Sequence, residues 1–307
     1  MPIAIASVDS VSINYTISGP STGQWLVLVN GLADDLQTWS ANIPAFTAAG
    51  YQVLAYDNRG IGQSSRSHGP YTAGIMAADL HSLLLHLDIA KFHLLGVSMG
   101  GMIAQTYALE YPNGSPAAKG RQMLSLSLCC TYAQPSAFCS RMFDLWAEMA
   151  ARMSVQDVMR DVTLWAFTVN FFRKRTDELE GVEYAMRKLD MSLEAYLAQL
   201  NVIRRFDSTA ALRELAEGGK KLGGLGEGEI MVLAGEEDIL IPVVLSKELC
   251  EAVPGSVWKT SPGGHGCLVS RSSSHCKLHD FEALTTSQWE YPDQFNQTVI
   301  EFLATIK

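Results

Sequence analysis

The sequence predicts an α/β protein: a mostly parallel central sheet, flanked by helices and carrying a helical cap insertion. Two observations lead to this fold class. Short apolar segments alternate with segments of helical periodicity, as a parallel sheet with crossover helices requires. One long stretch, residues 135–215, interrupts that alternation with helical periodicity alone. We therefore expect a single sheet whose two halves are separated by helices.

The first half of the chain contains most of the predicted strands. Alternating polar and apolar residues predict two strands joined by a short turn, and continuously apolar segments are typical of strands covered on both faces. Helical spacing of apolar residues predicts helices over 35–49, which Gly50 ends, and over 71–87. The predicted strands lie at 3–8, at 11–17, at 25–29, at 51–56, from Phe92 into a glycine-rich turn, and at 122–130.

The alternation resumes after the helical segment. Strands are predicted at 229–234 and 257–259, and helices at 243–252 and 292–306. The predicted organisation is a core made of residues 1–134 and 216–307, with a helical cap at 135–215. The cap is rich in Met, Phe and Trp, which can line an apolar pocket or pack the cap on the core.

A Gly-x-Ser-x-Gly sequence, centred on Ser98, stands between an apolar strand and a helical segment. Strand, sharp turn and helix are the context of a nucleophile elbow, in which the serine hydroxyl is exposed above the sheet. Gly96 and Gly100 fit such a turn because side chains there would collide with the strand or the helix. The alternative is a glycine-rich turn that carries a solvated serine.

A serine hydroxyl needs a base, and the base needs an orienting acid. The acid is predicted just past the strand at 229–234, where Glu236, Glu237 and Asp238 compete. The predicted base is His265, in a loop of small residues directly after the last strand. The other histidines are predicted to lie on helices, in a turn, in a buried strand or in the unusual segment described below.

Acyl chemistry also needs N–H donors for the developing oxyanion. The N–H of Met99, directly after the nucleophile, is one predicted donor. The loop after Val29 supplies the other, for which we choose the N–H of Leu32, because Gly31 allows the main chain to turn an amide inward.

Composition excludes several classes of function. The chain has 307 residues, 48% of them hydrophobic and 18% charged, which is typical of a globular interior and excludes disorder. Its net charge of −9, with no basic stripe, argues against nucleic acid or an anionic membrane as partner. We see no signal peptide and no apolar run of membrane-spanning length, and the six cysteines have no zinc spacing. The expectation is a cytoplasmic protein with reduced cysteines, no cofactor and no metal; a homodimer stays open.

Taken together, these motifs resemble the α/β-hydrolase fold family over the whole chain. Five motifs follow in the family's order along the chain. They are the oxyanion loop after Val29, then Asp57-Asn58-Arg59-Gly60-x-Gly62-x-Ser64, then the elbow, then the acid turn, and last Gly264-His265-Gly266. The resemblance implies Asp238 as the acid, because Gly-x-x-Asp-x-x-x-Pro is the family's usual acid turn. Asn30, in place of the common histidine, and the cap segment around 198–200 and 206–207 are most similar to the 3-oxoadipate enol-lactonase and lactonase/esterase group.

One segment, 269–288, departs from this pattern. Related chains run from the histidine within a few residues into the closing helix, whereas here a polar insertion intervenes. Val269-Ser270 can be encoded by GTAAGT, Leu284-Thr285 by CTAAC plus one base, and Gln288 by CAG. These are the donor, branch point and acceptor of a short intron, so we interpret the segment as a translated intron or a lineage-specific loop.

The sequence therefore predicts a serine hydrolase of a small, largely apolar carboxylic ester or lactone, acting through an acyl-enzyme on Ser98. A hydroxyl nucleophile excludes the epoxide hydrolases and haloalkane dehalogenases that the family also contains, since these use a carboxylate at the elbow. The alternatives are a C–C bond hydrolase of ring-fission-type diketones, a hydrolase-like small-molecule receptor, and an inactive homologue.

Overall fold

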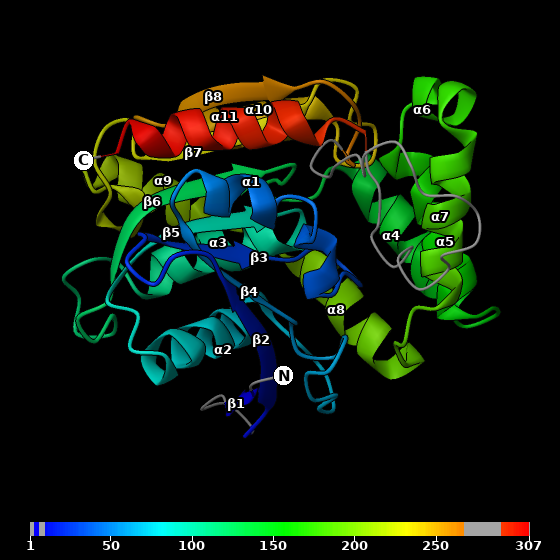
Figure 1. Cartoon of the computed structure of the whole chain (residues 1–307), viewed down its shortest axis with the longest axis horizontal. Helices are drawn as coiled ribbons and strands as arrows, with labels where there is room; N and C mark the ends of the chain where they lie inside the picture. The colour runs from blue at the N-terminus through cyan, green and yellow to red at the C-terminus, as the bar shows by residue number, and fades with distance from the viewer. Residues whose placement is uncertain (1–2, 6–9, 267–289, 307) are drawn as a thin grey trace.

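The computed structural model describes residues 3–5, 10–266 and 290–306 (Figure 1). Within these residues, eight strands form one sheet in the order β1-β2-β4-β3-β5-β6-β7-β8. Pairing is antiparallel between β1 and β2 and between β2 and β4, and parallel from β4 through β8. The predicted α/β fold with a mostly parallel sheet is confirmed. The unusual segment 269–288 lies outside the described residues.

The strands fall close to the apolar segments of the sequence. Of the strand predicted at 3–8, the structure describes residues 3–5, which form β1, and residues 6–8 lie outside the described residues. The bounds are β1 (Ile3–Ile5), β2 (Ser12–Ser18), β3 (Trp25–Val29), β4 (Gln52–Tyr56), β5 (Lys91–Val97), β6 (Gln122–Cys129), β7 (Ile230–Gly235) and β8 (Val257–Ser261).

Both faces of the sheet are covered. In β3, Leu26 and Leu28 face one core and Val27 and Val29 face the other, because successive side chains of a strand point to opposite faces. The first core includes side chains of α1 (Ile43–Ala48) and α11 (Pro292–Ala304). The second includes side chains of α2 (Ala73–His86), α3 (Met99–Glu110) and α10 (Val243–Ala252). Burial on both faces explains why these strands are apolar throughout.

The prediction of one continuous helix over 35–49 is wrong, because the structure has two separate helical segments there. The first is a 3-10 turn, η1 (Leu36–Trp39). Asp35 precedes it as the N-cap, and its side chain accepts a hydrogen bond from the N–H of Gln37. Helix α1 starts separately, with Pro44 in its first turn. Proline has no N–H to donate to the preceding turn, so it is accommodated at a helix start rather than inside a continuous helix.

The chain between β6 and β7 is helical, in a stretch that the structure describes completely. Its helices α4, α5, α6 and α7 stand together beyond one end of the sheet, and α8 leads back toward the core (Figure 1). No helix of the described residues is long and apolar enough to cross a membrane. The helices are α4 (Ala137–Ala150), α5 (Val155–Ala166), α6 (Val169–Lys174), α7 (Thr176–Arg187), α8 (Leu193–Arg205), α9 (Thr209–Glu217) and the 3-10 turn η2 (Leu222–Gly224).

Candidate active site

Ser98 occupies a strained turn between β5 and α3. Its φ of 55° and ψ of −119° lie in a region that L-residues rarely adopt, and such strain is typical of functional positions. A Cβ added at Gly96 would overlap the Gly100 carbonyl, and one added at Gly100 would overlap the carbonyl of Val29. Both glycines are therefore required by the close approach of backbone to backbone. The turn is also held by a hydrogen bond from the Ser98 N–H to the Cys129 carbonyl, 2.9 Å.

An acid–base pair lies at the ends of β7 and β8. His265 Nδ1 is 2.8 Å from Asp238 Oδ2, and the other carboxylate oxygen of Asp238 accepts the N–H of Ile241 at 2.9 Å. Asp238 is only 3% exposed, whereas Glu236 and Glu237 are exposed. Of the three acids that the sequence offered, the structure thus brings Asp238 to His265. A carboxylate on Nδ1 fixes the ring orientation and leaves Nε2 as the nitrogen that can take up a proton.

Ser98 and His265 line the same cavity, which has a volume of about 80 Å³. Its wall is largely apolar and comes from both the core and the cap. The apolar members are Leu32, Trp39, Val97, Met102, Phe143, Trp146, Met159, Val162, Ala166, Ile203, Leu240 and Ile241.

The loop after β3 forms another part of this wall. Asn30 is buried, and its side chain donates to the carbonyl of Tyr56 at 3.1 Å and accepts a hydrogen bond from the indole N–H of Trp39. Through these two bonds the Asn30 side chain holds the loop after β3 against Tyr56 and Trp39. Gly31 and Leu32 also line the cavity, so the predicted second oxyanion donor is on the same wall as Ser98.

Gln199 of α8 joins the helices between β6 and β7 to the loop after β3. Its side chain is fully buried, accepts the N–H of Ala33 at 3.0 Å and donates to the carbonyl of Arg59 at 2.9 Å. A buried amide bonded on both sides is costly to replace. Sequence reasoning included Gln199 only as part of a resemblance, because nothing local to α8 indicates a partner more than a hundred residues away.

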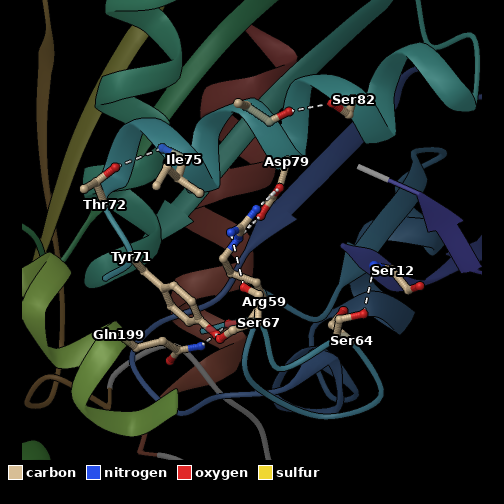
Figure 2. A network of polar contacts seen from close by, with 12 residues as sticks. Ser12, Arg59, Ser64, Ser67, Tyr71, Thr72, Ile75, Asp79, Ser82 and Gln199 are labelled. Atoms are coloured by element: carbon tan, nitrogen blue, oxygen red, sulfur yellow. Dashed lines mark hydrogen bonds and ion pairs between the residues drawn. The ribbon is translucent and has the colours of Figure 1, made fainter. Parts of the chain in front are cut away.

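The Asp57-to-Ser64 motif is structural support for this arrangement. The Arg59 guanidinium forms two hydrogen bonds with Asp79 of α2, at 2.6 and 2.7 Å, and lies 5.5 Å from the ring centre of Tyr71. Figure 2 shows this buried pair, with Gln199 approaching from the cap side. Asp57 accepts the N–H of Leu36 at 2.7 Å. The motif therefore anchors the loops behind the cavity and does not itself line it.

Glu290 holds the histidine loop. Its buried carboxylate accepts the N–H of Gly264 at 2.6 Å, and the N–H and hydroxyl of Thr168 at 2.6 and 2.5 Å. Thr168 belongs to the junction of α5 and α6, so this single side chain connects the cap to the residue beside His265. No pattern in the sequence predicts this role for Glu290. Its only signal is its place two residues before the proline that starts the closing helix.

The remaining described histidines lie elsewhere. Burial lowers the pKa of His81 and of His93 to about 4 in each case. His81 stacks on Tyr111, and His93 Nδ1 is 2.8 Å from the hydroxyl of Ser125. Both rings are thus neutral core residues near pH 7, and His275 and His279 lie outside the described residues.

One group of metal-ligand type occurs in the described part of the chain. The ligand atoms of Cys130, Asp238 and His265 lie within 4.8 Å of one another. Asp238 and His265 are already bonded to each other, so this group coincides with the acid–base pair.

A family model described as "alpha/beta hydrolase fold" matches residues 24–271. The chain belongs to the α/β-hydrolase fold family. This α/β-hydrolase is 23% identical over 293 residues to 3-oxoadipate enol-lactonase 2 of Acinetobacter baylyi, covering 95% of this chain and 93% of that protein. Hydrolase activity follows from family membership, and the predicted resemblance is confirmed at this level.

Solved structures show the same fold. The enol-lactonase of Burkholderia xenovorans LB400 superposes with a TM-score of 0.75 at 23% identity, over 99% of this chain and 100% of that one. A thermophilic esterase from Thermogutta terrifontis gives 0.74 at 23% identity, over 99% and 98%.

Proposed function

We propose that this hydrolase cleaves a carboxylic ester or lactone of a small, largely apolar molecule through an acyl-enzyme on Ser98. The observation that carries the proposal is the 2.8 Å pair of His265 and buried Asp238, on the same cavity as the strained Ser98. Serine, histidine and aspartate in these roles are sufficient for acyl transfer without a cofactor.

In the proposed mechanism, His265 Nε2 takes the hydroxyl proton while Ser98 Oγ attacks the substrate carbonyl. Asp238 keeps the ring in the correct tautomer and stabilises the imidazolium that forms. The N–H groups of Leu32 and Met99 receive the oxyanion, an effect of roughly 3–4 kcal/mol for each donor. His265 then protonates the departing alcohol oxygen, and a water activated by the same nitrogen releases the acyl group.

Two features support a small, largely apolar acyl group. The cavity is small, and most of the side chains that line it are hydrocarbon or aromatic. Apolar surface of this kind favours substrates that lose little solvation on entry. The partner we propose is accordingly a small-molecule ester or lactone, with no nucleic acid or membrane.

The experiment is labelling with a fluorophosphonate probe, followed by steady-state hydrolysis of p-nitrophenyl butyrate. We expect the wild-type chain to be labelled and to turn over many times, and Ser98→Ala to lose both. Ser82→Ala, on α2 and away from the cavity wall, is the matched control and should keep both. Full labelling of Ser98→Ala would place the nucleophile elsewhere, and a single stoichiometric burst would favour the receptor over the enzyme.

A further inference from the structure

Asp34 is an acidic side chain in the cavity wall that the proposed mechanism does not use. It lies in the oxyanion loop and lines the cavity together with Ser98 and His265. A Cβ placed on Gly31 would be 3.0 Å from Asp34 Oδ2 and 3.5 Å from Ser98 Cβ. The carboxylate and the serine thus both lie next to the small space that Gly31 leaves open.

The contacts of Asp34 differ from those of a structural acid. Asp57, in the neighbouring loop, accepts hydrogen bonds from Asn14 and from the N–H groups of Leu36 and Gln63. For Asp34, within the described residues, the side-chain partner is the hydroxyl of Thr38. A carboxylate offers about four acceptor positions, so Asp34 keeps capacity for a ligand.

Two titratable side chains, Asp35 and His265, affect the charge of Asp34. Asp35 belongs to its own loop, and His265 faces it from the loop after β8. Burial is the main cause that raises the pKa of Asp34 to about 7, Asp35 adds to it, and His265 and Thr38 act against it. The structure describes every residue of the stretch 130–229, between β6 and β7. The residues of this stretch that line the cavity carry no charge.

Asp34 and Thr38 also line a second cavity of about 290 Å³, between the oxyanion loop and the end of α7. Lys188 and Asp190 are the charged residues on its opposite wall. Asp34 and Thr38 therefore contribute to the lining of both cavities. Most of the other residues that line the cavity with Ser98 are apolar, and Asp34 is the acidic residue among them.

We propose that Asp34 determines substrate specificity: it accepts a hydrogen bond from a hydroxyl or ammonium group on the acyl part of the substrate and excludes acyl parts that carry a carboxylate there. This rests on the proposed ester or lactone hydrolysis. The acyl part is the relevant one, because it stays bound to Ser98 after the alcohol has left and must fit the inner cavity.

The physical basis is that a largely buried carboxylate attracts a hydrogen-bond donor on the substrate and repels a second carboxylate. A hydrogen bond to a charged acceptor is shorter and stronger than a neutral one. A second carboxylate at the same place is repelled by the charge of Asp34, because partly buried charges are screened less than charges in open water. An isosteric methyl group would leave the acid without its partner.

The test uses p-nitrophenyl esters at pH 8 that differ only in the acyl group. The 3-hydroxybutanoate and the 3-methylbutanoate form an isosteric pair, and the hydrogen succinate ester is compared with the pentanoate. The proteins are wild type, Asp34→Ala, Asp34→Asn and, as matched control, Asp35→Asn, whose side chain caps η1. Circular dichroism and thermal melting verify that each variant is folded.

We expect the wild type to prefer the hydroxy ester over its methyl isostere by about tenfold or more in kcat/KM, the effect of one charge-assisted hydrogen bond. In Asp34→Ala this ratio should fall to about one. In Asp34→Asn the hydrogen succinate ester should gain about tenfold relative to the pentanoate. Asp35→Asn should keep both wild-type ratios.

Ratios that are the same in wild type, Asp34→Ala and Asp34→Asn would overturn this inference while leaving the proposed function intact. A chain that neither reacts with the fluorophosphonate nor hydrolyses any of the four esters would instead overturn the proposed function. The two failures are therefore distinguishable.

Discussion

The Asp34 side chain is also predicted to make stability depend on pH. Burial and the charge of Asp35 raise the pKa of Asp34 from 3.8 to about 7, so the native protein holds this proton more tightly than the unfolded chain. Between these two values the native state binds more protons, and its stability falls as pH rises. Above pH 7 the loss is complete. Asp34→Asn removes the titration and with it the loss.

The magnitude follows from the two pKa values. One pKa unit corresponds to about 1.4 kcal/mol, so the change from 3.8 to about 7 is worth at most ~4 kcal/mol above pH 7. Between pH 5 and pH 7 the free energy of unfolding of Asp34→Asn should gain about 2 kcal/mol relative to wild type, because the native carboxyl is already half ionised at pH 7. The change with pH is diagnostic, because a lost bond to Thr38 contributes a constant offset.

Urea denaturation at half-unit steps from pH 5 to pH 8.5 measures this difference. Asp34→Ala serves as the control, since it removes the same titrating group and should give the same dependence with a different offset. A difference that stays flat from pH 5 to pH 7 in both variants would refute the reasoning. It would mean that the carboxyl is solvated in the native protein and has its ordinary pKa.

Two further outcomes test the catalytic pair and the turn. Asp238→Asn should lower kcat about 10⁴-fold, because the histidine loses the carboxylate that fixes its tautomer; an unchanged kcat in ester hydrolysis would contradict this role. Gly100→Ala should lower the melting temperature sharply, because its Cβ would overlap the carbonyl of Val29. The matched control is Gly181→Ala in α7, where the added Cβ meets nothing within 4 Å and helix propensity should add up to about 1 kcal/mol. Equal melting of the two variants would show that the turn tolerates a side chain.

Much of the fold could be predicted because its signals are local. Apolar runs mark the strands, and Gly96 and Gly100 mark a turn that no larger residue can form. The order of Ser98, an acid loop and His265 is equally visible in the sequence. The choice of Asp238 over Glu236 and Glu237 came from resemblance, and the structure supplies its physical reason, which is burial against the imidazole.

The supporting residues could not be predicted, because their partners lie far away in the chain. Gln199 bonds to Ala33, and Glu290 bonds to Thr168. Neither pairing has a periodicity or a spacing that a sequence pattern can reveal. Asp34 and Asp35 look alike in sequence, and only the structure separates the acid that lines the cavity from the one that caps a helical turn.

The insertion of helices between β6 and β7 has a consequence for how the protein is made. About 100 residues separate two strands that must pair side by side, from Leu126 with Ile230 to Cys129 with Leu233. Bringing the ends of a loop of this length together costs roughly 4 kcal/mol of chain entropy, and this cost precedes the stabilisation that the strand pairing provides. During synthesis Ser98 emerges from the ribosome well before His265, the base in the proposed mechanism. A nascent chain would thus carry an uncovered strand edge on β6, and the proposed active site would be complete only when β7 and β8 have joined the sheet.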